Sequence, residues 1–305
     1  MLVSEASGSL RHNRRVVDTF RCTAAARESG EPMVGTAPTD ATYLLVEYAG
    51  AWGRKALAES RLPDAVKAHL DSEAGVRVLL VRRHGGLSGP GVRVFAVQVE
   101  PASTRIETTV LDDAEALLGV DVALLARGEL PGWEAYDGEL HLVCTNGRRD
   151  LCCAELGRPV AAALSARWPA STWEVTHLGG HRFAPTLLSF PSAVCLGRLD
   201  AESAVLAVEE LQAGRHPVGF TRGRVGVPEA AQVAQVHVVE QTSLDRLGEV
   251  RVLGEDRGLV RVDADGEQWQ VAVKASRSAP RRQSCGETFE KPATVHEVLA
   301  AGPVA

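Results

Sequence analysis

Three cysteines and two histidines in one stretch of the chain constrain its fold more than any other feature. Cys144, Cys152 and Cys153 lie within ten residues, and His177 and His181 follow with Leu-Gly-Gly between them. The first forty residues lack the apolar core of a secretory signal, which favours a reducing compartment and metal binding over disulfides. We therefore expect a fold that brings these five side chains together.

The segment around these residues predicts the element order of a thioredoxin. The predicted elements are strands at 139–143 and 172–175 with a helix at 153–168 between them, then strands at 186–190 and 194–199 and a helix at 201–214. This order places Cys144 at a strand end, the cysteine pair at a helix start, and both histidines just after the second strand. The glycines between the histidines argue for a loop there.

The rest of the chain completes the prediction of an α/β fold. Before this segment, strands at 43–48, 75–83, 92–100 and 104–111 and helix-like stretches at 51–73 and 112–127 repeat much of the same order, with 75–83 and 92–100 expected to form a hairpin. After it come a helix at 228–241, three strands, and a last helix near Thr294. We expect two thioredoxin-like halves and a small α+β C-terminal region.

Two thiolates and two imidazoles suit either an iron–sulfur cluster or zinc, because both accept sulfur and nitrogen ligands. Structural zinc sites usually draw a cysteine pair from a short knuckle of about two to four intervening residues. Eight residues separate Cys144 from Cys153, and seven separate Cys144 from Cys152. The wider loop favours a [2Fe-2S] cluster. The spacing alone leaves Cys152 and Cys153 as alternatives.

Three stretches of the sequence resemble the sucrase/ferredoxin-like family. They are CTNGRRDLCCAELG, HLGGHRFAPTLLSFPSAVCLGR and, in the first half, LVEYAGAWGRKALAESRLP. The resemblance implies a thioredoxin-like ferredoxin domain whose [2Fe-2S] cluster has two cysteine and two histidine ligands. Carried over residue by residue, it implies Cys144, Cys153, His177 and His181, and Cys153 is preferred to Cys152 on this register alone. Pro185 resembles the cis proline that opens the third core strand of thioredoxins.

The predicted division of the chain has four parts. We expect a disordered N-terminal segment at 1–40, a degenerate thioredoxin-like half at 41–136, the thioredoxin-like ferredoxin domain at 137–215 and the α+β region at 216–305. Because Met1 and Met33 are the only methionines, translation could start at either, which N-terminal sequencing of the natural protein would decide.

Composition and missing motifs exclude several classes of function. A net charge of −6 without a long run of like charges does not indicate a nucleic-acid-binding surface. No apolar run approaches the roughly 18 to 20 residues that span a bilayer, so we expect a cytoplasmic protein. The sequence has no G-x-S-x-G elbow, P-loop or G-x-G-x-x-G. It also singles out no carboxylate pair for sucrose hydrolysis.

The sequence thus predicts an electron-transfer protein, with both cysteines on one iron, both histidines on the other, and an unidentified redox partner protein. Ligating imidazoles could couple electron transfer to proton uptake. Two alternatives remain: a structural zinc-binding interaction module with the same four ligands, and a thiol redox sensor using Cys153. An arginine among Arg148, Arg149 and Arg182 could offset the charge of the cluster. Cys195 is read as a buried apolar residue, and Cys22 and Cys285 have no assigned role.

Overall fold

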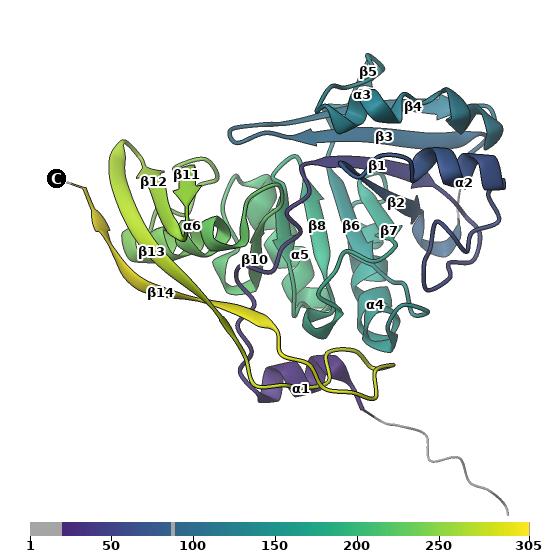
Figure 1. Cartoon of the computed structure of the whole chain (residues 1–305). Helices are drawn as coiled ribbons and strands as arrows, with labels where there is room; N and C mark the ends of the chain where they lie inside the picture. Colours follow the sequence, from purple (N-terminus) through teal and green to yellow (C-terminus); the bar gives the residue numbers. More distant parts are fainter. Residues whose placement is uncertain (1–19, 87–88, 305) are drawn as a thin grey trace, which may run out of the picture.

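Two strand–helix–strand units with the same pairing pattern build the large sheet of this protein. The computed structural model describes residues 20–86 and 89–304 (Figure 1). In the first unit, β1 (Thr42–Glu47) pairs in parallel with β2 (Val76–Arg82) and antiparallel with β3 (Val92–Val99), which pairs with β4 (Thr104–Leu111). In the second, β6 (Leu140–Cys144) pairs in parallel with β7 (Thr172–Val175) and antiparallel with β8 (Leu187–Phe190), which pairs with β9 (Val194–Leu196).

An antiparallel contact between β2 and β7 joins the two units into one ten-stranded sheet within the described residues. Its strand order is β10-β9-β8-β6-β7-β2-β1-β3-β4-β5, with β10 (Thr221–Arg224) and β5 (Glu134–Ala135) at the edges. β10 pairs with β9 although it lies beyond residue 215. The expected α+β region at 216–305 therefore contributes a strand to the large sheet, and the division into four domains stays a prediction.

Side chains along the strands of the first half alternate between two cores, one on each face of the sheet. In β1, Leu44 and Val46 face the helices of the first half, whereas Tyr43 and Leu45 face the second half. The helices of the first half are α2 (Asp64–Leu70), η2 (Glu115–Gly119) and α3 (Val122–Ala126), and those of the second are α4 (Leu151–Arg167) and α5 (Ala201–Gln212). Figure 1 shows the two sets on opposite sides of the molecule. The inner faces pack on each other through edge-to-face aromatic contacts such as Phe95 with Trp173, 5.6 Å between ring centroids.

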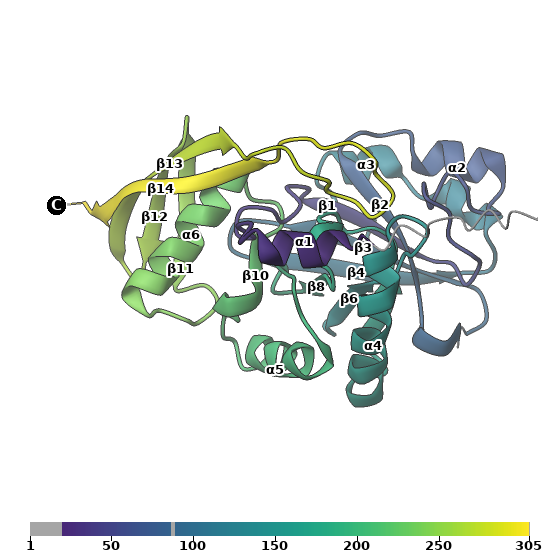
Figure 2. The ribbon, with the colours of Figure 1, turned by 90° about the horizontal axis from the view of Figure 1, so that it is seen from below.

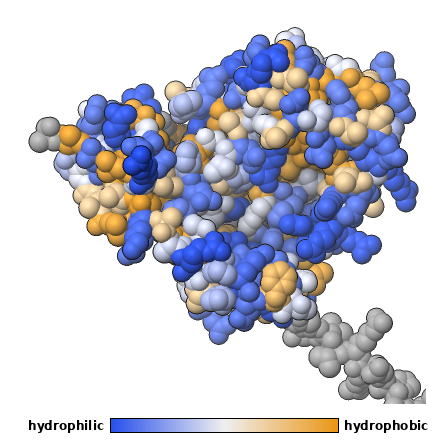
Figure 3. All heavy atoms as spheres, viewed as in Figure 1, coloured by the Kyte–Doolittle hydropathy of each residue, from blue (hydrophilic) through white to orange (hydrophobic). Residues whose placement is uncertain are grey.

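A separate antiparallel sheet follows the large one. It contains β11 (Val250–Asp256), β12 (Leu259–Ala264), β13 (Glu267–Arg277) and β14 (Thr294–Pro303), and it packs on α6 (Glu229–Thr242). Hydrophobic side chains show at the surface over this sheet in Figure 3, where Leu253 and Leu259 are exposed. Residues 278–293 leave the sheet after β13, pass α1 (Cys22–Glu28) and return to begin β14 (Figures 1 and 2).

Several predicted elements differ in the structure. The strands at 75–83 and 92–100 do not form a hairpin, because β1 lies between β2 and β3 and pairs with both. The last helix expected near Thr294 is wrong, since β14 pairs along β13 there. The helix-like stretch at 51–73 contains a helix only at α2. The mixed α/β class itself is confirmed, and the Ala184–Pro185 peptide bond is cis, as the resemblance implies.

The N-terminal segment differs from the prediction of disorder where the structure describes it. Cys22 and Ala26 of α1 are buried, and Thr23 Oγ1 donates to the carbonyl oxygen of His181 at 3.2 Å. These contacts are with residues more than a hundred positions away, so a local pattern could not reveal them. Residues 1–19 lie outside the described residues. Among the described residues, no helix combines the length and apolarity that a membrane span requires.

Candidate metal centre

Cys144 and Cys153 meet where β6 ends and α4 begins. Both are buried in the core between the two halves of the sheet. Asp150 caps α4 by accepting a hydrogen bond from the backbone N–H of Cys152 at 3.0 Å, which fixes the first turn of the helix. A Cβ atom at Gly157 would collide with the carbonyl oxygen of Cys144, so this glycine lets α4 approach the strand end closely.

The loop between the cysteines is shaped by Asn146. Its Oδ1 accepts from the backbone N–H groups of Arg148 and Arg149, both at 3.2 Å, and its Nδ2 donates to the carbonyl oxygen of Gly53 at 3.1 Å. The side chain thereby forms an Asx turn and ties the loop to the first half. The loop reverses the direction of the chain, so that Cys144 at the end of β6 and Cys153 in the first turn of α4 share one site.

The histidines occupy a glycine loop held by two arginines. Gly179 and Gly180 have φ angles of +86° and +64°, a backbone region that favours glycine, and the loop runs into η3 (His181–Phe183). Arg222 is 1 % exposed and donates to the carbonyl oxygen of Gly179 at 3.1 Å. Arg77 donates to the carbonyl oxygen of His177 at 3.2 Å.

Four potential ligands gather at this point. The ligand atoms of Cys144, Cys153 and His177 all lie within 4.8 Å of one another, and His181 Nδ1 lies 3.4 Å from His177 Nε2. Within the described part of the chain, the other two imidazole nitrogens, His177 Nδ1 and His181 Nε2, are buried and have no hydrogen-bond partner. Buried polar atoms without partners are costly, so two sulfurs and two imidazoles here fit a metal centre.

Burial and neighbouring groups favour ligand-competent protonation states. The Cys153 thiol, and after it the His177 imidazole, lower the pKa of Cys144, while the neighbouring Cys144 and burial raise the pKa of Cys153. The pair therefore favours one thiolate. Burial lowers the pKa of His181 to about 4, which keeps its ring neutral. A thiolate and neutral imidazoles are the forms that bind metal.

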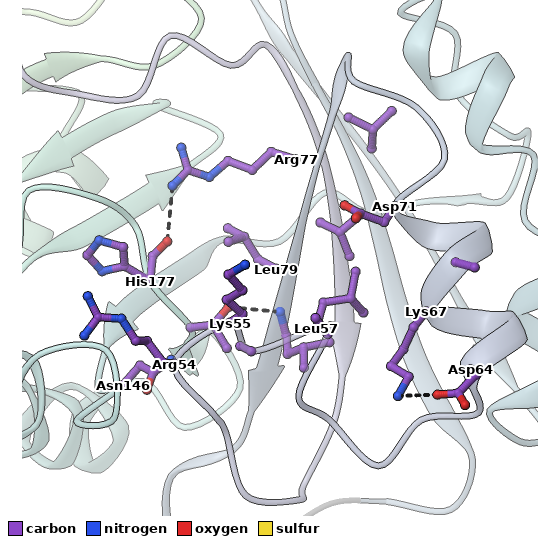
Figure 4. Close-up of a pocket in the computed structure, with 17 residues that line it drawn as sticks. Arg54, Lys55, Leu57, Asp64, Lys67, Asp71, Arg77, Leu79, Asn146 and His177 are labelled. Atoms are coloured by element: carbon purple, nitrogen blue, oxygen red, sulfur yellow. Dashed lines mark hydrogen bonds and ion pairs between the residues drawn. The ribbon is translucent and has the colours of Figure 1, made fainter.

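A hollow of about 630 Å³ opens beside His177. Figure 4 shows Arg54, Lys55 and Lys67 around it, together with Arg77 and His177. Lys67 pairs with Asp64 at 2.6 Å, and Arg77 pairs with Asp40 at 2.6 Å. Arg54 and Lys55 are exposed and make no ion pair within residues 20–86 and 89–304. The histidine edge of the site thus faces solvent through a basic recess, although the chain as a whole is acidic.

Of the arginines singled out in the sequence, Arg149 and Arg182 lie near His181, and after burial and His177 their positive charges also lower the pKa of its ring. Arg148 is exposed, and Arg182 pairs with Glu31 at 2.6 Å. The buried arginine near the site is Arg222, which also donates to Cys195 Sγ at 3.4 Å. Cys195 is fully buried in the core, as expected. Arg222 lies beyond both ligand motifs, and β10 brings it to the site by pairing with β9; no local signal could have identified it.

A second group of potential ligands was missed by the sequence analysis. Cys22, Cys152 and Cys285 meet beside Asp150, with ligand atoms all within 4.8 Å of one another. Hydrogen bonds from Cys22 and Cys285 lower the pKa of Cys152 to about 3. Cys152 thus lies with a different set of partners from Cys153. The only signals in the sequence were two cysteines without an assigned role, Cys22 and Cys285, and a third, Cys152, that was an alternative ligand for the first site.

Comparison with known proteins gives the family. The sucrase/ferredoxin-like family matches residues 33–223, and the chain belongs to this family. The matched region contains both cysteines and both histidines of the first group, whereas Cys22 and Cys285 lie outside it. No curated protein matches the chain, and no solved structure does.

Proposed function

We propose that this protein is an electron carrier that holds a [2Fe-2S] cluster through Cys144, Cys153, His177 and His181. The observation that carries the proposal is the group of Cys144, Cys153 and His177, whose ligand atoms lie within 4.8 Å of one another. His181 lies against His177, and each ring keeps one buried nitrogen without a hydrogen-bond partner in the described residues. Mixed cysteine and histidine ligation is known from Rieske [2Fe-2S] centres. Membership of the sucrase/ferredoxin-like family supports the same reading.

The pairing pattern supports thioredoxin-like halves as part of this proposal. Each half has a central strand with a parallel partner on one side and an antiparallel pair on the other, in the orders β2-β1-β3-β4 and β7-β6-β8-β9. That is the layout expected of a β-α-β unit followed by two antiparallel strands. Among the described residues, the first half contributes to neither group of potential ligands, which supports a role for it as the packing partner of the second half.

The residues around the site suit an electron carrier. Bound there, the cluster would supply one-electron chemistry at a potential above that of an all-cysteine cluster, because neutral imidazoles replace two anionic thiolates. Arg222 and Arg77 hold the histidine loop by its carbonyl oxygens, and their positive charges would stabilise added negative charge. We propose that the redox partner approaches the recess beside His177. Coupling to proton uptake stays a prediction, which the pH dependence of the reduction potential would test.

The test of this proposal starts from full-length protein purified without oxygen. We expect a red-brown protein with two irons and two acid-labile sulfides per chain. His177→Ala and His181→Ala should each lose the visible absorption, whereas His237→Ala, on α6, should keep it. His177→Cys should retain a [2Fe-2S] spectrum with a lower reduction potential, because a thiolate adds negative charge. Protein without iron, or both alanine variants with an unchanged spectrum, would contradict the ligand assignment.

A structural zinc site is the second candidate, and one observation favours it. Cys144, Cys153 and His177 offer ligand atoms within 4.8 Å of one another, a span that a single tetrahedral ion can bridge. Such a protein would be colourless and redox-silent, so the same metal analysis decides. The thiol-sensor alternative has less support, because Cys153 is fully buried and its pKa is raised, whereas a reactive thiol needs exposure and a low pKa.

A further inference from the structure

The second cysteine group joins three segments that are remote in sequence. Cys22 comes from α1, Cys152 from the first turn of α4, and Cys285 from the loop at 278–293. Cys152 Sγ lies 3.3 Å from Cys285 Sγ, which lies 3.6 Å from Cys22 Sγ, and Cys22 Sγ lies 3.4 Å from Asp150 Oδ1. The three thiols and one carboxylate therefore enclose a single point.

These four groups are buried, and no disulfide joins any two of the three cysteines. Their exposed fractions are 1 % for Cys22, 3 % for Asp150, 1 % for Cys152 and 8 % for Cys285. The sulfurs are much farther apart than the about 2.05 Å of a disulfide, and all three cysteines are free. Three thiols gathered beside a buried carboxylate are an unusual interior, even though the cysteines also pack against Ala184 and Phe20. The group has the character of a ligand set.

The separations match one tetrahedral ion. In a site with Zn–S bonds of about 2.3 Å, neighbouring sulfurs lie about 3.8 Å apart. The two sulfur–sulfur distances along this group, 3.3 and 3.6 Å, are close to that value. Three sulfurs and one carboxylate oxygen are donors that zinc accepts.

Surrounding hydrogen bonds orient the ligands. Asp150 Oδ2 accepts from Ser284 Oγ and from the backbone N–H of Cys285, both at 2.8 Å, while Oδ1 faces Cys22. The backbone N–H of Cys22 donates to Cys285 Sγ at 3.5 Å. Bonds of this kind fix the direction of ligands around a metal and are typical of built sites.

We propose that Cys22, Cys152, Cys285 and Asp150 bind one Zn²⁺ ion, which displaces the protons still held by the thiols and fastens α1 and the loop at 278–293 to the start of α4. The proposed zinc ligands are different residues from the proposed cluster ligands. The two sets are adjacent in the sequence, because Cys152 directly precedes Cys153. Asp150 Oδ2 is also 3.9 Å from His181 Nε2. The zinc site therefore holds α1 and the loop at 278–293 over the His181 side of the first site, while the His177 side stays open to the recess.

The experiment measures zinc and iron in the full chain, purified without oxygen from cells supplied with both metals. We expect one zinc per chain, and a decrease of at least about fivefold in Cys22→Ser and in Cys285→Ser, because each removes one of four ligands of a closed site. The iron content and visible spectrum should persist in both variants. Cys195→Ser, which removes a buried thiol outside both groups, should keep zinc and iron.

Two further measurements keep the outcomes distinct. Cys144→Ser should lose iron and keep zinc, so failure of the proposed cluster does not resemble failure of the zinc site. Wild-type chain stripped of zinc and titrated with Co²⁺ should develop thiolate charge-transfer bands that Cys285→Ser lacks; if that variant is insoluble, Cys22→Ser takes its place in the comparison. In limited proteolysis, Cys285→Ser should be cut within 278–293 faster than Cys195→Ser.

Several results would overturn the proposal. They are wild-type protein without zinc that also fails to bind Co²⁺, zinc content unchanged in both Cys22→Ser and Cys285→Ser, and iron rather than zinc lost from those variants. Intact-mass measurement showing a disulfide between two of the three cysteines in anaerobically purified protein would also overturn it.

Discussion

At the scale of single residues, Gly180 sets the position of the histidine loop. Its φ angle is +64°, and a Cβ atom there would collide with the guanidinium of Arg222, which is buried and hydrogen-bonded and so cannot move aside freely. Gly214 has a similar φ of +71° but open space around it. Gly180→Ala should therefore destabilise the protein by about 1–3 kcal/mol more than Gly214→Ala, measured by denaturant unfolding. Equal effects of the two substitutions would mean that the clash is relieved without cost.

His216 gives the protein a residue-scale dependence on pH. It is 9 % exposed, and burial lowers its pKa to about 4 from 6.5. The unfolded chain binds the proton near pH 6.5, whereas the folded chain binds it only near pH 4, so acidification across this interval favours unfolding. The loss approaches about 3 kcal/mol at the acid end. His216→Gln should lose less stability between pH 6.5 and pH 4.5 in denaturant titrations; parallel curves for the two proteins would show that His216 is not the cause.

At the scale of elements, the sequence predicted strands and helices better than their partners. The strand at 43–48 was expected because it is an apolar run, and β1 is buried along its first five residues. A strand buried on both faces needs backbone partners on both edges. β1 therefore separates β2 from β3, although the turn-rich residues between them resemble a hairpin connection. The local sequence pattern does not show which strands pair with the two edges of β1.

The same distinction applies to the candidate sites. Cys144, His177 and His181 could be nominated because local elements place them at or just after strand ends, whereas Cys153 was preferred to Cys152 only on the register of the family resemblance. Cys22 and Cys285 could not be nominated, because they lie 263 positions apart and only the return of the chain after β13 brings them together. The helix expected near Thr294 failed for a related reason: β14 exists because β13 offers it a paired edge. Contacts between residues far apart in the sequence determine strand pairing and the grouping of ligands, which short sequence patterns do not determine.

At the scale of the whole molecule, the two halves of the sheet together form the basic recess beside His177. The first half contributes Arg54 and Lys55, and the second contributes Asn146 and His177 (Figure 4). Neither half forms this recess alone. The first half thus places positive charge around the His177 edge of the candidate site, although it contributes to neither group of potential ligands among the described residues.

Charge in this recess should control electron exchange with charged reagents. Lys55→Glu should slow the oxidation of the reduced protein by anionic ferricyanide about two- to fivefold at low salt, because it weakens electrostatic attraction. The rate of electron exchange with cationic hexaammineruthenium should not fall. Lys274→Glu, with the same change in net charge on exposed β13, should leave both rates near those of the wild type. The difference should shrink as salt screens the charges. Equal slowing by both substitutions, measured by stopped flow, would mean that overall charge rather than this recess guides the approach.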